Sequence, residues 1–271
     1  MNAAVVQLAS LGALAFAIVL FLIQAAAGEV GLRLGLLKVR RKAAAPEGVS
    51  VIVGGMLGLL AFVLALTLSY SNQRFQERRT GVIEDANAIG TAWLRAQAIG
   101  GPRGAEIARL LEDYTRLRID FVKADRDSPE LSAINARTNT LQSRMWGHLT
   151  AIVRERPDAA STALMSALND VIDLSTVERF AFSLGVPPLL FWLLTGMSTV
   201  SIASLGYQLG LRNQRLRGLS LLLIAMWTAI ITLILDLGAP RLGDLRVGTA
   251  VYEWTLQGFQ GGVTIPPVPP R

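Results

Sequence analysis

Long apolar runs alternate with polar segments along this chain. A helix needs roughly 20 predominantly apolar residues to cross the hydrocarbon core of a bilayer. Runs of about that length, free of charge at their centres, occupy residues 1–27, 50–70, 187–206 and 219–235. The pattern therefore predicts four transmembrane helices, and we number them first to fourth in chain order.

The stretch from Ser50 to Arg95 organises the chain, because its helical pattern continues past the end of the second membrane helix. Beyond Tyr70, apolar residues recur at helical spacing among charged ones, and only two glycines, Gly81 and Gly90, weaken the pattern. We expect one helix that crosses the membrane and runs on into a soluble helical domain.

The region that follows also has helical periodicity. Apolar stripes run from Ile107 to Phe121, from Leu131 to Ile152 and from Leu164 to Ile172. Gly100-Gly101-Pro102 breaks the first helix, and Ser128-Pro129-Glu130 is typical of a helix start, because serine accepts from free amides and proline fits the first turn. No stretch alternates as a strand would.

The predicted fold is therefore an all-α integral membrane protein, with four transmembrane helices and a helical soluble domain inserted between the second and the third. The expected parts are the first two membrane helices in residues 1–70, the soluble domain in 71–185, the last two membrane helices in 186–237 and a tail in 238–271. The tail contains a short helix around Tyr252 to Phe259 and does not span the membrane.

The first apolar run has two interpretations. Ala25-Ala26-Ala27 resembles a signal-peptidase site, but no basic residue precedes the run and it is long for a signal core, so we favour a retained membrane helix. Residues 29–48 are expected to form a polar connection. Five basic residues lie in it, and such a cluster is typical of a solvated loop or of one that meets anionic lipid headgroups: Arg33, Lys38, Arg40, Arg41 and Lys42.

Composition supports a membrane protein. The chain is 52% hydrophobic and 17% charged, with a mean hydropathy of +0.44 and a net charge of +6. No basic patch is interleaved with aromatic residues, so the positive charge does not indicate nucleic acid; loops beside membrane helices explain it better. Cysteine is absent, which excludes disulfides and thiolate chemistry.

Catalytic signatures are missing from the sequence. There is no P-loop, nucleophile elbow or dinucleotide fingerprint. The single histidine, His148, lies on a soluble helix without the partners that a zinc site or a catalytic triad needs. No charge lies at the centre of a membrane helix, which argues against proton-coupled transport. We expect no enzyme activity, cofactor or metal.

One face of the second membrane helix carries Gly54, Gly58, Phe62, Ala65 and Ser69. The glycine pair is typical of close helix packing, which is the plainer interpretation. The other is a pore lining in which Phe62 narrows the middle.

Charged residues follow that face. Arg74, Arg78 and Arg79 form a solvated surface in a monomer, or a basic vestibule if several copies surround an axis. Further on, Asp85 and Asn87 are expected to hold the helix to its neighbours, with Arg78, Arg79 or Arg95 as the partner of Asp85.

Several segments resemble the bestrophin-like family of bacterial and plant membrane proteins, a domain of unknown function distantly similar to bestrophin channels. The resembling segments cover most of the chain: RFQERR, EDANAIGTAWLRA, YTRLR, ALNDVIDL with Arg179, the Pro187-Pro188 start of the third membrane helix, and LDLGAPRLGDLRV. EDANAIGTAWLR is the most specific of them, and Asp85 stands where the family usually has Glu.

The resemblance implies a homo-oligomer, a pentamer as in bestrophins, with four membrane helices per subunit and a pore lined by the second. It implies passive ion conduction, with anions such as chloride as the first expectation. No acidic run resembles the calcium clasp of animal bestrophins, so calcium gating is not implied. The alternative is a non-conducting membrane scaffold or sensor whose helical domain binds a partner.

Orientation is left open by two opposing indications in a bacterial inner membrane. The short loops carry the positive excess, with five basic residues in 29–48 and three in 207–217. The positive-inside rule then places these loops in the cytoplasm and the helical domain in the periplasm. The resemblance to bestrophins, and the arginines after the second membrane helix, favour a cytoplasmic domain. Because the resemblance to bestrophins is distant, we favour the charge rule and a periplasmic domain.

Overall fold

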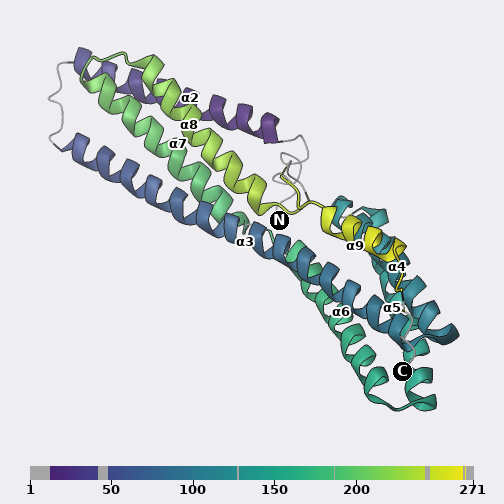
Figure 1. The fold of residues 1–271 in the computed structure, drawn as a ribbon. Helices are drawn as coiled ribbons and strands as arrows, with labels where there is room; N and C mark the ends of the chain where they lie inside the picture. Colours follow the sequence, from purple (N-terminus) through teal and green to yellow (C-terminus); the bar gives the residue numbers. More distant parts are fainter. Residues whose placement is uncertain are drawn as a thin grey trace. The chain divides into compact units, whose positions relative to one another are not determined.

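The structure is a computed structural model that describes residues 13–41, 48–126, 128–185, 187–241, 245–264 and 266. Within these residues it is all-α, as predicted, with no strand. The helices, shown in Figure 1, are α2 (Ala13–Arg40), α3 (Val49–Ile99), α4 (Gly101–Lys123), α5 (Pro129–Glu155), α6 (Ala159–Ser183), α7 (Pro188–Leu211), α8 (Arg217–Gly238) and α9 (Ala250–Gln260).

Four helical segments are long and apolar enough to cross a membrane, and they contain the last three predicted spans and the described part of the first, from residue 13. The second span belongs to α3, a single helix of 51 residues, which confirms the predicted continuation into polar sequence. Gly81 does not interrupt it, because a helical glycine costs only about 1 kcal/mol relative to alanine.

Helix α2 corrects the prediction of a polar connection from Glu29 onward, which is wrong for residues 29–40. The helix runs on to Arg40, because Gly31, Leu32 and Gly35 are buried in its last turns. The Ala25-Ala26-Ala27 motif lies inside this helix, and the first part of the predicted span, residues 1–12, lies outside the described residues.

Local sequence sets the boundaries of the other helices. Gly100 and Gly101 have φ angles of 65° and 66°, which glycine adopts without steric penalty, and so the chain turns between α3 and α4. Ser128 caps α5, since its hydroxyl accepts a hydrogen bond from the Leu131 amide at 3.1 Å. Asp158 caps α6 in the same way through the Ser161 amide at 2.8 Å.

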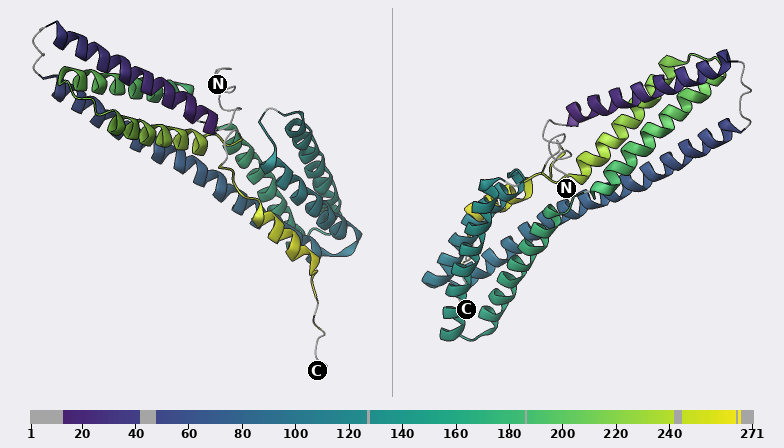
Figure 2. Two further views of the ribbon diagram at one scale, coloured as in Figure 1. Left: turned by 90° about the horizontal axis from the view of Figure 1, so that it is seen from above. Right: turned by 180° about the vertical axis from the view of Figure 1, so that it is seen from behind.

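Two compact units divide the chain, and Figure 2 shows their helices from two further sides. The first comprises residues 1–75 and 185–246, and therefore contains α2, the first part of α3, α7 and α8. The second comprises residues 76–184 and 247–271, with the rest of α3, α4, α5, α6 and α9. Thus α9, in the predicted tail, is part of the second unit.

The first unit is held by an apolar core and by unusually close contact between α2 and α7. Leu60, Leu194 and Ile231 are among its fully buried core residues. A Cβ on Gly31 would lie 2.0 Å from the Ala203 carbonyl oxygen, and a Cβ on Gly206 would lie 2.2 Å from that of Gly28. Only glycine permits this approach of two backbones.

A polar contact supports the same helix pair. The Gln24 Nε2 donates to Ser198 Oγ at 3.0 Å, and Gln24 is fully buried. Ser198 therefore joins α7 to α2 within the first unit.

Candidate functional site

The feature of α3 that sets it apart is a stripe of exposed, uncharged residues. At intervals of three or four residues, which is the spacing of one helix face, α3 exposes Gly54, Gly58, Phe62, Ala65, Ser69, Asn72, Gln76, Thr80, Ile83 and Asn87. We call these ten residues the α3 stripe. The side chain at Phe62 is the bulkiest of them, and Phe62 is 61% exposed.

The five predicted pore-lining residues all belong to the α3 stripe. The opposite face of α3 makes the contacts within the first unit, because Val53, Leu60 and Leu64 are buried there. A Cβ built on Gly54 or on Gly58 meets no atom within 4 Å. These glycines therefore do not mediate close helix packing within the subunit; that role belongs to the glycines of α2 and α7.

The three arginines predicted to form a vestibule have different environments. Arg79 is exposed, next to the α3 stripe. Arg74 is half-buried, and its Nε donates to the Tyr70 hydroxyl at 3.2 Å. Arg78 is only 2% exposed. Of the three arginines, Arg79 alone borders the α3 stripe, because Arg74 shares a helix side with the buried Ser71 and Arg78.

A buried charged cluster connects four helices of the second unit: Asp85 of α3, Arg118 of α4, Glu178 of α6 and Tyr252 of α9, which we call the Asp85 cluster. Arg118 donates from Nε to Asp85 Oδ2 at 3.1 Å and from Nη2 to Glu178. The Tyr252 hydroxyl donates to the same Asp85 oxygen at 2.6 Å. None of these four residues is more than 2% exposed.

Burial explains why the contacts within the Asp85 cluster matter for the stability of the second unit. Two carboxylates and one guanidinium are shielded from water, so each depends on its partners for the solvation that it has lost. The Arg118 guanidinium also lies 4.4 Å from the centre of the Phe121 ring. Burial, followed by the nearby charge of Asp85, raises the pKa of Tyr252 well above its ordinary value, so this hydroxyl remains a donor at neutral pH.

Within the subunit, the partner of Asp85 at the predicted junction is Arg118. Asp85 holds α3 to its neighbours, but Arg118 takes the place of Arg78, Arg79 or Arg95. Arg95 instead donates to the Ala163 carbonyl at 2.6 Å, which joins α3 to α6. Asn87 is exposed on the α3 stripe and does not belong to the cluster.

Sequence reasoning missed Arg118, Glu178 and Tyr252, although two of them carried a signal. Arg118 lies between Tyr114 and Phe121 on the apolar stripe of α4, and Glu178 lies between Val171 and Phe182 on that of α6. A charge at a core position of an amphipathic helix indicates a buried partner. Tyr252 had no comparable signal, because it lies 167 residues from Asp85 in the sequence.

The architecture is that of a multi-pass helical membrane protein, and comparison with known proteins identifies its family. The bestrophin-like domain family matches residues 20–252. The chain therefore belongs to the bestrophin-like family, as its motifs indicated. Among curated proteins, none shows significant sequence similarity to it.

Solved structures of similar fold include a bacterial bestrophin homologue from Klebsiella pneumoniae. It is 14% identical, with a TM-score of 0.68, over 89% of this chain and 96% of that one. A mutant of that homologue is 16% identical, with a TM-score of 0.68, over 89% of this chain and 98% of that one. At this identity the likeness concerns the fold.

Proposed function

We propose that this chain is one subunit of a homo-oligomeric ion channel in which the α3 stripe of each subunit lines the conduction path. Anions, with chloride first, are the proposed permeant ions, and a pentamer is the proposed assembly by resemblance to bestrophins. The observation that carries the proposal is the α3 stripe, a helix face whose ten residues are exposed and uncharged from Gly54 to Asn87, with open space around Gly54 and Gly58.

The composition of the α3 stripe favours a path over a lipid-facing surface. Lipid-facing helices expose large apolar side chains, as α8 does with Leu219, Leu222, Met226 and Leu233. In its membrane part the stripe instead has Gly54, Gly58, Ala65 and Ser69, with Phe62 as the single large residue. Small residues leave room around an axis, and an aromatic ring in their midst supplies a constriction that gates by dewetting.

Charge beside the α3 stripe supports the preference for anions. Arg79 is exposed and borders the stripe near Gln76 and Ile83, whereas Arg74 lies on the other side of the helix. Repeated around an axis, Arg79 would form a basic ring, which raises the local anion concentration and disfavours cations.

The proposed location is the bacterial inner membrane, with the basic loops in the cytoplasm. Lys38 and Arg40 end α2, and Arg212, Arg215 and Arg217 lie between or next to α7 and α8. The positive-inside rule then puts residues 76–184 in the periplasm. A reporter that is active only in the periplasm, fused after Arg271, should be active; activity confined to a cytoplasmic reporter would reverse the orientation.

Ion flux through liposomes tests the proposed function. Purified full-length protein should give chloride flux, and Phe62→Ala should increase it by removing the constriction. Leu59→Ala is the matched control, because Leu59 is similarly exposed but lies beside a cavity against α7; it should leave flux unchanged. If the wild type gives no flux of any ion, the channel is rejected and the scaffold or sensor takes its place.

A further inference from the structure

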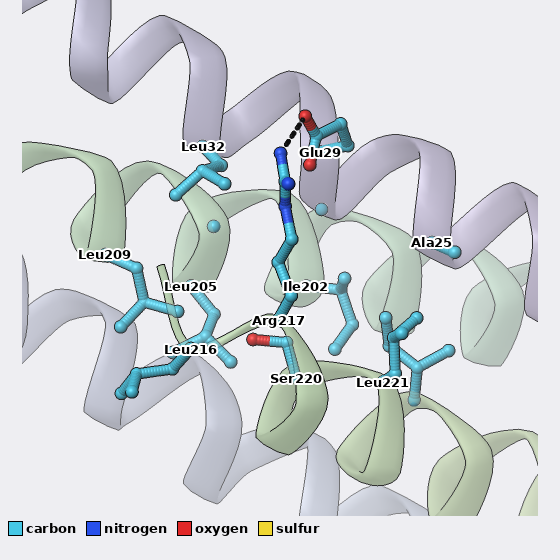
Figure 3. A pocket seen from close by; sticks show the side chains of 13 residues that line it. Ala25, Glu29, Leu32, Ile202, Leu205, Leu209, Leu216, Arg217, Ser220 and Leu221 are labelled. Atoms are coloured by element: carbon cyan, nitrogen blue, oxygen red, sulfur yellow. Dashed lines mark hydrogen bonds and ion pairs between the residues drawn. The ribbon is translucent and has the colours of Figure 1, made fainter. Parts of the chain in front are cut away.

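A small cavity lies in the first unit, among α2, α7 and α8, apart from the α3 stripe. It has a volume of about 160 Å³, and its wall is mainly aliphatic, with Leu32, Ile202, Leu205, Leu209 and Leu221 among its lining residues. Figure 3 shows that the polar side chains, Glu29, Arg217 and Ser220, are few beside these. The cavity thus combines an apolar interior with a charged edge.

The charged edge is a triad of one carboxylate and two guanidinium groups. Arg217 reaches from α8 to α2, where its Nη2 donates to Glu29 Oε1 at 3.0 Å (Figure 3). Arg33 donates from Nε to the same oxygen at 3.0 Å. The side chains of Arg217 and Arg33 are 60% and 73% exposed. Glu29 therefore holds two arginines at one place, and each keeps further N–H donors for a ligand.

Charge around the cavity favours an anion over a neutral or cationic molecule. The triad has a net charge of +1 by the formal charges of Arg33, Arg217 and Glu29. Five further basic residues, none of which lines the cavity, lie at or just beyond the C-terminal ends of α2 and α7: Lys38, Arg40, Arg41, Arg212 and Arg215.

The charged edge of the cavity lies at the end of a membrane helix, which is where lipid headgroups are expected. Helix α8, one of the candidate spans, begins at Arg217, while Ser220, Leu221 and Ile224 of the cavity wall lie in the following turns. The charged edge therefore faces the interface, and the aliphatic wall faces the acyl region.

We propose that this cavity binds an anionic phospholipid from the surrounding bilayer. The phosphate of the lipid accepts hydrogen bonds from Arg217 and Arg33. The part of one acyl chain nearest the headgroup fills the space beside Ile202 and Leu205. Glu29 positions the two guanidinium groups. This site is independent of ion conduction, because none of these residues belongs to the α3 stripe.

The test measures lipid retention by delipidated full-length protein in detergent. Phosphatidylglycerol, phosphatidylethanolamine and phosphatidylcholine with identical chains are added separately, and bound lipid is counted by native mass spectrometry. Phosphatidylglycerol should be retained best. Arg217→Gln should weaken its retention about ten-fold, as expected for loss of a charged hydrogen bond, and Arg33→Gln about five-fold.

Matched variants distinguish binding in this cavity from a general attraction of anionic lipids to basic residues. Arg215→Gln removes an exposed arginine of the same connection that does not line the cavity, and it should leave retention unchanged. Ser220→Phe fills the cavity without removing charge and should also reduce retention. Arg217→Lys keeps charge but not the guanidinium fork, and should retain phosphatidylglycerol better than Arg217→Gln does.

Specific results would overturn the proposal. Equal retention of the three lipids, or better retention of phosphatidylethanolamine, would remove the anionic preference. Equal effects of Arg217→Gln and Arg215→Gln would show a diffuse basic surface instead of this site. Thermal stabilisation by glycerol phosphate equal to that by phosphatidylglycerol would show that the apolar cavity takes no part.

Discussion

At the scale of single residues, Asp85 is a position where a substitution should destabilise the protein. It is fully buried, and it accepts from both Arg118 and Tyr252. Replacing it by alanine leaves Arg118 paired with Glu178, but it removes the acceptor of Arg118 Nε and the nearest acceptor of the Tyr252 hydroxyl. A buried donor left without its acceptor typically costs about 1–3 kcal/mol. Asp85→Ala should therefore lower the thermal unfolding temperature of the full-length protein markedly.

An exposed ion pair serves as the control for this variant. Arg103 and Glu155 lie 2.9 Å apart with side chains 44% and 63% exposed. Because exposed pairs contribute under about 1 kcal/mol, Arg103→Gln should leave the unfolding temperature nearly unchanged. If the two substitutions lowered the unfolding temperature equally, the Asp85 cluster would contribute no more to stability than an exposed ion pair does.

Because of Tyr252, the stability of the second unit should decrease as the pH rises into the alkaline range. Its pKa in the folded protein is raised by burial and by Asp85, whereas in the unfolded chain it is about 10. Since the folded pKa is the higher one, the stabilisation is fully present below pH of about 10, and it is lost as pH rises toward the folded pKa. Tyr252→Phe should be less stable than wild type at pH 8, and the difference in unfolding temperature should narrow above pH of about 10.

Chemical denaturation at several pH values measures this difference, with Tyr207→Phe as the control. Tyr207 lies on α7 in the first unit, whereas the Asp85 cluster belongs to the second. A constant difference between wild type and Tyr252→Phe across the alkaline range would contradict the assigned role of the Tyr252 hydroxyl.

At the scale of the elements, α2 and α7 depend on glycines that α3 does not need. A Cβ on Gly31 would lie 2.0 Å from a carbonyl oxygen of α7, so alanine there must push the two helices apart. Overpacking of this kind costs about 1–3 kcal/mol, which exceeds the intrinsic helix preference for alanine. Gly31→Ala should therefore lower the unfolding temperature of the solubilised subunit.

The α3 glycines should give the opposite result. Gly58 has no atom within 4 Å of a built Cβ, so Gly58→Ala should leave the subunit at least as stable as wild type. Gly58→Leu should leave the subunit folded but reduce the oligomer measured by light scattering, if α3 faces other subunits. An unchanged oligomer would remove Gly58 from the subunit interface.

Local sequence was sufficient to predict most elements, but not the contacts between them. The length of α3, the Ser128 cap and the short helix near Tyr252 depend on neighbours in sequence, and each appears in the structure. The end of α2 was mispredicted because Arg33 and Lys38 suggested a loop, whereas packing of Gly31 and Gly35 on α7 keeps it helical. The glycine pairs Gly31–Gly35 and Gly206–Gly210, each four residues apart, are typical of close helix packing and could have predicted the contact of α2 with α7. The interpretation of residues 29–48 as a loop left this pattern unused.

At the scale of the whole molecule, the proposed channel makes a prediction about charge selectivity. Arg79 is exposed next to the α3 stripe, so in an assembly around an axis it would face the path of the ions. Arg79→Glu should shift the reversal potential toward that of the cation, with a modest change in conductance. The shift should diminish at high salt, because exposed charges are screened beyond about 10 Å at 0.1 M ionic strength.

Substitutions of two other arginines test whether the shift in reversal potential comes from a charge that borders the conduction path. Arg137→Glu changes the same charge on the exposed surface of α5, and it should leave the reversal potential unchanged. Arg78→Glu places a negative charge at a position that is 2% exposed, so it should reduce the amount of folded protein instead of reversing selectivity in a stable channel. If Arg79→Glu and Arg137→Glu shift the reversal potential equally, the selectivity comes from overall charge. If neither shifts it while chloride still flows, Arg79 does not border the path, and the α3 stripe must meet the axis along its membrane part alone.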